Sequence, residues 1–210
     1  MRKVQFFYDV VSPYSWLAFE IFSRFKTPWE IDFELCPFFL GGVMRDTDNR
    51  APSMLPARAP YMLKDLMRQS EYYQIPMQIP SDFLTNTITA MRLLTVVKEK
   101  DPSNLESLSR AFWQRHYGEG QEISSPESLL ACAANANIST NEAKNYLELT
   151  QDPYIKEKLK TTTANAVGKG AFGAPTFFVE TADGEEMFFG SDRFHLVAAM
   201  LGKKWNGPKP

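Results

Sequence analysis

Strand patterns occur only near the two ends of this 210-residue chain. Residues 4–36 predict a strand, a helix and a second strand, and residues 176–190 predict two more strands joined by a short turn. Between them, from about residue 55 to residue 168, helix patterns recur and no strand pattern is convincing. Any sheet must therefore be assembled from both ends of the chain, across a long helical insertion.

The N-terminal end carries clear local signals. Val4–Val11 is almost continuously apolar, as in a strand that is covered on both faces of a sheet. Ser12 is a natural N-cap and Pro13 suits a first helical position, so a helix is expected to begin there. Pro28 ends it, because a proline disfavours the helical conformation of the residue before it. Ile31–Cys36 then alternates apolar and acidic residues, which is typical of a half-covered strand.

The insertion predicts roughly five helices, and the C-terminal end predicts a hairpin and a last helix. Apolar residues recur at helical spacing after residues 88 and 105, and later helices are expected to begin at Ser125, Ser139 and Asp152. Asp183-Gly184 is a strong hairpin signal between the last two strands. Ser191-Asp192 is expected to cap the final helix.

These elements, in this order, predict an α/β protein with a thioredoxin-like fold. Its mixed four-stranded sheet would be flanked by helices and would carry a large all-helical insertion. The expected division is a discontinuous thioredoxin-like domain of residues 1–54 and 169–210, and a helical domain of residues 55–168. A chain of this length buries roughly 70% of its unfolded surface, so its stability requires no metal or disulfide.

Charge and composition argue against several classes of function. The formal net charge is −2 and no basic stripe is present, which argues against a nucleic-acid partner. No apolar stretch has the roughly 18 residues that a membrane span needs, and the N-terminus leads directly into a strand instead of a cleavable leader. Cys36 and Cys132 are the only cysteines, which indicates buried thiols in a reducing, intracellular compartment, although a bridge between them stays open.

The turn after the first strand is the expected active site. In a thioredoxin-like fold this turn brings free N–H groups and the positive end of a helix dipole to the surface, where they stabilise a thiolate. Redox members of the fold carry Cys-x-x-Cys here, whereas this chain has Ser12-Pro13-Tyr14-Ser15. Disulfide exchange requires a protein thiol, so the site cannot perform it. A serine hydroxyl can still donate to a bound small-molecule thiol, and Ser12 is better placed than Ser15, one turn further on.

Glutathione, the abundant intracellular thiol, is the expected ligand. Taken alone, Ser12 is simply an N-cap, as Ser125 is expected to be. The later segment Gly-Ala-Pro-Thr favours the functional interpretation, because the fold places a cis-proline beside the helix N-terminus. Pro175 is therefore expected to be cis, although an ordinary strand-start proline is the simpler interpretation. Ala174 would then pair through its backbone with the Cys-Gly portion of glutathione.

A third segment, Gly190–Arg193, is expected to meet the γ-glutamyl end of the ligand. Its N–H groups and Ser191 would hold the α-carboxylate, and Asp192 would accept from the α-ammonium. An N-cap role is compatible with this function, because an N-cap is also where anions bind.

These segments together resemble the kappa-class glutathione transferases, which have DsbA-like topology, and the resemblance covers nearly the whole chain. The matching segments are Phe7–Leu17, Asp48–Pro52, Ala90–Arg92, Gly170–Pro175, Gly190–Arg193 and Gly202–Pro208. The resemblance implies a homodimeric detoxification enzyme in which the glutathione thiolate attacks electrophiles such as aryl halides and hydroperoxides. Glutathione is then a co-substrate, with no prosthetic group or metal. The resemblance also implies a mitochondrial or peroxisomal location, for which the sequence shows no clear address.

The resemblance also assigns roles to individual residues. Ser12 becomes the hydrogen-bond donor to the thiolate, and contacts with glutathione are implied for Ser12, Pro13, Tyr14, Asn49, Ala174, Pro175, Ser191 and Asp192. Asn49 on its own would be an ordinary turn residue. The family often has leucine where this chain has Ala174, so the backbone contacts should persist while some packing on glutathione is lost.

Two other functions stay open on the same scaffold. The bacterial 2-hydroxychromene-2-carboxylate isomerases resemble the chain through the same serine motif, and they would use the thiolate for reversible addition. A non-catalytic module that binds glutathione or peptides would need a misplaced Ser12 hydroxyl or a pocket filled by aromatic side chains. The electrophile pocket, expected from residues 61–83, distinguishes the two enzymes. His116 and His195 have no partner at nucleophile–base spacing and are expected to be structural or exposed.

Overall fold

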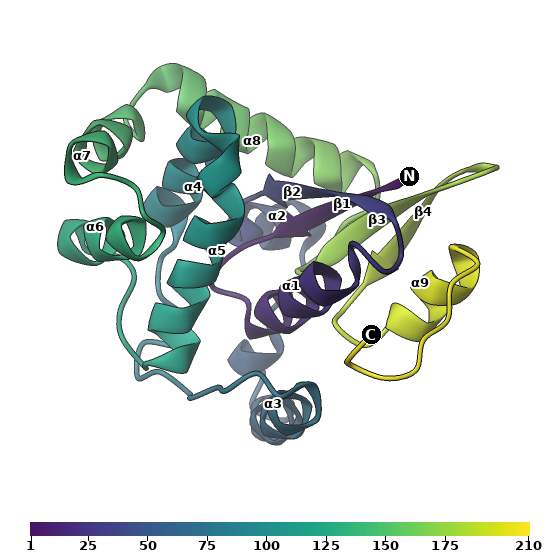
Figure 1. Ribbon diagram of the computed structural model, residues 1–210. Helices are drawn as coiled ribbons and strands as arrows, with labels where there is room; N and C mark the ends of the chain where they lie inside the picture. Colours follow the sequence, from purple (N-terminus) through teal and green to yellow (C-terminus); the bar gives the residue numbers. More distant parts are fainter.

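A computed structural model describes the whole chain, residues 1–210. At its centre is one mixed sheet with the strand order β2-β1-β3-β4 (Figure 1). β1 (Arg2–Tyr8) pairs in parallel with β2 (Ile31–Pro37) and antiparallel with β3 (Thr176–Thr181), and β3 pairs antiparallel with β4 (Gly184–Phe189). The two ends of the sequence therefore meet in one four-stranded sheet, and the predicted thioredoxin-like fold is confirmed.

β1 is apolar at successive positions because both faces of the sheet are covered. Phe6 points into the larger core, where its ring lies 5.9 Å from that of Phe22, centroid to centroid. Phe7 points to the opposite face and packs against Phe38 and Phe178. Since successive side chains of a strand point to opposite faces, the continuous apolar pattern supplies both cores at once.

Helices cover each face of this sheet (Figure 1). α1 (Pro13–Phe25) and α9 (Phe194–Met200) lie on the face of the larger core, and α2 (Leu40–Thr47) and α8 (Pro153–Gly168) lie on the other face. α1 begins as predicted, with Pro13 in its first turn. No sequence signal announces α2, because its two glycines lower its helix propensity and tertiary contacts form it.

The insertion contains helices and no strand, as predicted, although α3 (Ala59–Tyr73) was not among the five predicted helices. In addition to α3 and α8 it contains α4 (Ile88–Lys100), α5 (Leu105–Trp113), α6 (Pro126–Asn135) and α7 (Thr140–Leu149). Short helical turns lie at η1 (Pro52–Met54), η2 (Pro102–Asn104) and η3 (Gln114–Gly118), the last being a π-helical continuation of α5. Ser125, Ser139 and Asp152 accept first-turn N–H groups of α6, α7 and α8, which confirms the three predicted caps.

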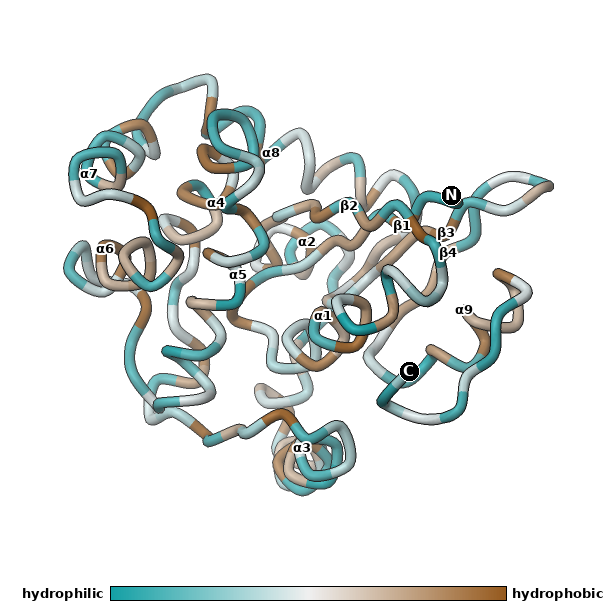
Figure 2. Tube along the Cα trace, in the orientation of Figure 1, coloured by the Kyte–Doolittle hydropathy of each residue, from teal (hydrophilic) through white to brown (hydrophobic).

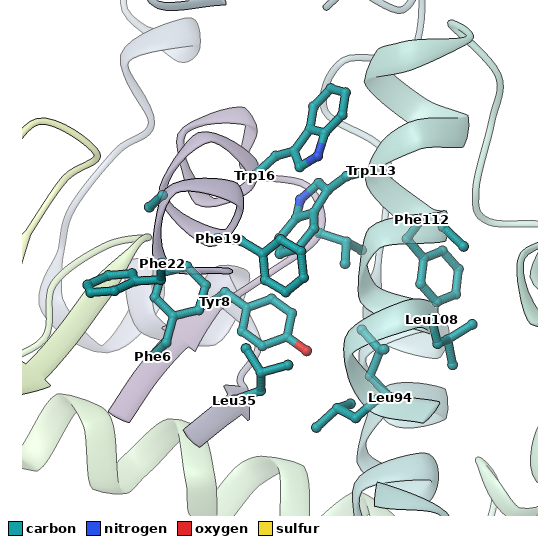
Figure 3. Packing of buried hydrophobic residues seen from close by; sticks show 14 of the residues in the cluster. Phe6, Tyr8, Trp16, Phe19, Phe22, Leu35, Leu94, Leu108, Phe112 and Trp113 are labelled. Atoms are coloured by element: carbon teal, nitrogen blue, oxygen red, sulfur yellow. The ribbon is translucent and has the colours of Figure 1, made fainter. Parts of the chain in front are cut away.

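The insertion shares its core with the sheet. One cluster of 45 buried residues includes side chains from β1, α1, α4, α5 and α6. Trp113 of α5 packs against Phe19 of α1 and Tyr8 of β1, with ring centroids 4.9 Å and 5.2 Å away (Figure 3). The predicted division into two parts, residues 1–54 with 169–210 and residues 55–168, therefore follows the order of the elements along the chain. The two parts share the main hydrophobic core.

Figure 2 shows hydrophobic stretches along the central strands and a mixture of hydrophobic and hydrophilic residues on peripheral helices such as α7. No helix has both the length and the apolar character that crossing a membrane requires. Cys36 and Cys132 are both buried and unbridged. Burial raises the pKa of each thiol to about 12, so both stay protonated at neutral pH.

The predicted cap of α9 is wrong. The N-cap is Arg193, and it makes no side-chain capping bond. The reason is tertiary: the Ser191 hydroxyl is turned inward to the side chain of Gln69 (2.9 Å), and the Asp192 carboxylate pairs with the guanidinium of Arg193 (2.9 Å). These contacts orient both side chains elsewhere, and neither accepts a first-turn N–H group of α9.

Candidate active site

Ser12 occupies the turn between β1 and α1, at the N-terminus of the helix. Its hydroxyl oxygen accepts the N–H of Ser15 (3.1 Å) and its proton is donated to the carbonyl of Ala174 (3.3 Å). The N–H of Tyr14 donates to no other backbone group. A hydroxyl and a free amide therefore lie together at the positive end of the α1 dipole, which is the donor set that a thiolate requires.

The segment before β3 faces this turn. The peptide bond between Ala174 and Pro175 is cis, as predicted. The Ala174 carbonyl accepts the Ser12 hydroxyl, and the Ala174 N–H donates to no other backbone group. An extended peptide can pair with a backbone that offers a carbonyl and a free N–H in this way.

Two contacts fix the loop that leads to Ala174. The side-chain amide of Asn49, in the turn after α2, donates to the carbonyl of Phe172 (2.6 Å). Gly173 allows the loop to approach β4 closely, since a Cβ at this position would lie 2.8 Å from the ring of Phe189. Asn49 is thus more than a turn residue, because it connects the end of α2 to the backbone beside Ser12.

A cavity of about 410 Å³ opens beside Ser12. The predicted site residues that line it are Ser12, Pro13, Tyr14, Asn49 and Ala174, whereas Pro175, Ser191 and Asp192 do not. Much of the remaining wall is apolar and is formed by Phe39, Leu40, Met44, Pro52, Met54, Met62, Phe83, Leu84 and Phe189. The predicted electrophile segment, residues 61–83, contributes Met62 and Phe83 but not Tyr61.

Asp9 is a fully buried carboxylate at the edge of this cavity. One oxygen accepts the N–H of Val11 (3.0 Å) and the hydroxyl of Thr87 (2.7 Å), and the other accepts the N–H of Leu40 (2.9 Å). Burial raises the pKa of Asp9 to about 6, against the opposing effect of these three donors. Asp9 thereby connects the β1–α1 turn to the starts of α2 and α4.

A chain of polar side chains leads from the cavity to the third predicted segment. The Tyr14 hydroxyl donates to the Asp65 carboxylate (2.9 Å), which also accepts from the side chain of Gln69 (2.6 Å). Gln69 in turn accepts the Ser191 hydroxyl. The Tyr73 hydroxyl donates to the Ser191 carbonyl (3.0 Å). α3 therefore connects Ser191 to the Ser12 turn, and the carboxylate of Asp192 stays exposed beside it.

The sequence prediction missed the residues that support the site. Asp9, Thr87, Asp65 and Gln69 act across sequence separations that local patterns do not detect. One signal was available for Asp9, because a lone carboxylate inside the apolar run Val4–Val11 must be buried and paired.

The two histidines lie outside the cavity. His116 is fully buried with Nδ1 near the carbonyl of Gln121 (3.1 Å), and burial lowers its pKa. His195 is exposed on α9. Both positions agree with the predicted structural or exposed roles. No group of three or more His, Cys, Asp or Glu side chains is arranged to hold a metal ion.

Comparison with known proteins places this architecture in a family. The DSBA-like thioredoxin domain family matches residues 3–202. A solved structure of 2-hydroxychromene-2-carboxylate isomerase superimposes with a TM-score of 0.80 at 22% identity, covering 95% of this chain and 94% of that one. This likeness establishes the fold.

Two relatives are much more similar in sequence. Glutathione S-transferase kappa 1 of Homo sapiens is 42% identical, covering 100% of this chain and 95% of the human protein. Glutathione S-transferase kappa 1 of Rattus norvegicus is 39% identical with the same coverage. Similarity of this extent over the full length distinguishes them from the isomerase. The chain belongs to the DSBA-like thioredoxin domain family and, within it, to the kappa-class glutathione S-transferases.

Proposed function

We propose that the Ser12 turn activates glutathione as a thiolate, which attacks apolar electrophiles in the adjoining cavity. The observation that carries the proposal is the Ser12 hydroxyl, which lies at the N-terminus of α1 and opposite the backbone of Ala174. The Ser12 hydroxyl and the Tyr14 N–H would donate to the sulfur, and the helix dipole would favour its negative charge. Together they would lower the pKa of the bound thiol.

Binding would redirect the Ser12 proton. In the free chain this proton is shared with the Ala174 carbonyl at 3.3 Å. The cysteine N–H of glutathione would replace it on that carbonyl, while the Ala174 N–H would donate to a ligand carbonyl, as in strand addition. The Ser12 hydroxyl would then be free to turn toward the sulfur. Binding of glutathione would thus release the Ser12 hydroxyl to act as the hydrogen-bond donor to the thiolate.

The apolar cavity wall is suited to bind electrophiles with apolar groups, such as aryl halides and organic hydroperoxides. With an aryl halide, the sulfur forms a bond to the carbon and the halide leaves with its bonding pair. With a hydroperoxide, the sulfur takes the terminal oxygen, the O–O bond breaks to release an alcohol, and a second glutathione reduces the sulfenic acid to give the disulfide and water. Both routes begin from the same thiolate, so Ser12 would serve both.

Ser191 and Asp192 are proposed to meet the γ-glutamyl end of glutathione. The exposed Asp192 carboxylate can accept from the α-ammonium. The Ser191 hydroxyl would first have to leave Gln69, its present acceptor. Backbone N–H groups near Ser191 are therefore the more direct donors to the α-carboxylate.

A glutathione-dependent isomerase is the second candidate. Arg50 is the only lysine or arginine that lines the cavity, and its exposed guanidinium could receive the carboxylate of a hydroxychromene carboxylate. We favour the transferase, because the kappa relatives are 42% and 39% identical while the isomerase structure is 22% identical. Assaying purified protein with an aryl halide and with a hydroxychromene carboxylate separates the two activities.

We also propose that the chain forms a homodimer. α3 exposes several apolar side chains instead of burying them, namely Tyr61, Leu63, Met67 and Tyr72. Exposed apolar side chains gathered on one element are typical of a contact surface, and a two-fold dimer pairs such a surface with its own copy.

Substitutions at Ser12 test the thiolate mechanism. Ser12→Ala should lower kcat roughly ten- to hundredfold and raise the pKa of bound glutathione, because the hydroxyl donor is lost. Ser12→Asn retains a side chain that can cap α1 and should still impair catalysis. The measurement is kcat with an aryl halide, together with an ultraviolet absorbance titration of the bound thiolate.

Ser125→Ala is the matched control, because Ser125 also precedes a proline and caps α6 through the N–H of Ser128 (3.2 Å). It should cost about 1 kcal/mol of stability, as a lost cap does, with no effect on turnover. Full activity in Ser12→Asn would show that Ser12 acts only as a cap. A wild-type protein that binds glutathione without shifting its thiol pKa would instead indicate the non-catalytic binding module.

A further inference from the structure

Val11, the residue before Ser12, has both of its backbone polar groups held by side chains. Its N–H donates to the carboxylate of Asp9 (3.0 Å), and its carbonyl accepts the hydroxyl of Tyr117 (2.6 Å). The next N–H, that of Ser12, donates to the Asp9 carbonyl (3.0 Å). The peptide plane between Val11 and Ser12 is therefore fixed at its oxygen and at its nitrogen. Its orientation determines where the Ser12 hydroxyl points.

Tyr117 reaches this peptide from the helical insertion. It is 106 residues from Val11 in sequence and lies in η3, the π-helical turn at the end of α5. A π-helical turn inserts one residue into a helix and redirects the side chains of that turn, and such turns are frequent at functional sites. Here the redirected side chain is the one that contacts the active-site backbone.

The ring of Tyr117 is held as firmly as its hydroxyl. It is fully buried, stacks with Trp16 of α1 at 6.4 Å and meets Phe83 edge-on at 5.9 Å, centroid to centroid. Burial raises the pKa of Tyr117 well above its ordinary value, so the hydroxyl stays protonated and can only donate to the Val11 carbonyl. Phe83 also lines the cavity. Tyr117 thus touches both the thiol turn and the electrophile wall.

We propose that Tyr117 is a positioning residue of the thiol site, which orients Ser12 by holding the Val11 carbonyl. The inference rests on the proposed thiolate function and extends it to a residue that contacts neither sulfur nor electrophile. Asp9 holds the other side of Val11, and it is itself oriented by the Thr87 hydroxyl (2.7 Å). The helical insertion therefore supplies both supports, one directly through Tyr117 and one through Thr87.

The test is Tyr117→Phe, which retains the ring and removes only the hydroxyl. Without it the Val11 carbonyl loses its partner and the Ser12 turn gains freedom. The expected result is a roughly three- to tenfold fall in kcat and a rise of about half a unit to one unit in the pKa of bound glutathione. The KM for glutathione should change less than twofold, since none of its proposed contacts is removed.

Tyr8→Phe is the matched control. Tyr8 is also fully buried, and its hydroxyl shares a hydrogen bond with Ser109 (2.5 Å), in the core and away from Ser12. Both variants should lower the thermal unfolding midpoint to a similar extent, and Tyr8→Phe should leave kcat and the thiol pKa unchanged. If Tyr117→Phe behaves like Tyr8→Phe in all three measurements, or fails to fold where Tyr8→Phe folds, the positioning role is refuted.

A second variant approaches the same peptide from the other side. Thr87→Val keeps the shape of the side chain and removes the hydroxyl that orients Asp9, so it should raise the thiol pKa in the same direction. The proposal would be overturned if wild type lowers the pKa of bound glutathione and neither Thr87→Val nor Tyr117→Phe raises it again. If wild type does not lower the pKa of bound glutathione below that of free glutathione, the proposed thiolate function is wrong. The positioning role of Tyr117 then falls with it.

Discussion

Ser12 and Ser15 show how two identical side chains in one motif acquire different properties. Ser12 has an acceptor and a donor and faces the cavity, whereas the Ser15 hydroxyl is buried without any hydrogen-bond partner. A buried hydroxyl without a partner costs free energy, whereas a buried thiol at the same position would cost less, since a thiol is only a weak donor. The preference for Ser12 over Ser15 therefore has a structural basis.

Asp9 should make stability fall as pH rises. Its pKa is raised to about 6 in the folded chain, from an ordinary value of 3.8, so the folded state binds the proton more tightly than the unfolded chain does. The stabilisation is complete below pH 4 and is lost as pH rises through 6, by roughly 3 kcal/mol for a shift of this size. The measurement is the free energy of unfolding of wild type and Asp9→Asn from pH 4 to 7.

The loss of unfolding free energy in Asp9→Asn, relative to wild type, should accordingly be larger at pH 4 than at pH 7.

Glu34→Gln should show the opposite dependence on pH. Burial alone would raise the pKa of Glu34, but hydrogen bonds from Gln5, Lys3 and Lys98 outweigh it and lower the pKa to about 2. Its deficit should therefore grow as pH rises from 2 to 5. An Asp9→Asn deficit that is independent of pH would contradict the raised pKa of Asp9.

At the scale of elements, several ion pairs join the insertion to the sheet domain, among them Lys26–Glu106, Lys98–Glu34 and Arg110–Glu20. Arg110 of α5 donates to Glu20 of α1 (2.9 Å), and it also reaches Glu106 (3.3 Å) and the Ser23 hydroxyl (3.3 Å). Its guanidinium lies 4.8 Å from the centre of the Phe19 ring. α1 carries Ser12 at its start, so this contact also fixes the helix on which the site is built.

Arg110→Met should lower the free energy of unfolding by about 1–2 kcal/mol, because it leaves the partly buried carboxylate of Glu20 without its cation while keeping the apolar stem. Glu106 keeps its ion pair with Lys26 (2.6 Å). Denaturant unfolding at neutral pH measures the loss. The control is Arg45→Met, whose ion pair with Asp46 (2.7 Å) is solvent-exposed and should leave stability unchanged. Equal effects of the two substitutions would show that the Arg110 contact contributes nothing beyond an ordinary surface pair.

Elements with strong local signals were predicted well, and those formed by packing were not. α1, α6, α7 and α8 begin at a serine or aspartate cap, three of them followed by proline, and these signals act within a few residues. α2 has two glycines and no cap, and it forms because Leu40 and Val43 are buried on the sheet. The cap of α9 was mispredicted because Gln69, 122 residues away, takes the Ser191 hydroxyl.

At the scale of the whole molecule, the proposed dimer is testable through α3. Leu63 and Met67 are four residues apart, and each side chain is 40% exposed. Replacing both with glutamate should weaken dimerisation at least roughly tenfold, since like charges would face each other across a two-fold contact. Sedimentation over a range of protein concentrations measures the effect.

Leu196→Glu, an exposed apolar position on α9, serves as the control and should leave the association state unchanged. A wild-type chain that sediments as a monomer at all concentrations would rule out the homodimer. A dimer that survives the double substitution would place the contact elsewhere on the surface.

The sequence by itself determined the thioredoxin-like order of elements, the caps of α1, α6, α7 and α8, and the turn at Ser12. These features depend on neighbouring residues, whose preferences are local and additive. Only the tertiary structure decided the cavity walls, the inward turn of Ser191 and the supports of Val11. Those depend on hydrogen bonds and ring contacts between segments as much as 106 or 122 residues apart. The helix start at Ser12 could be predicted from its neighbouring residues, whereas the contacts of Asp9 and Tyr117 with Val11 form only in the folded chain.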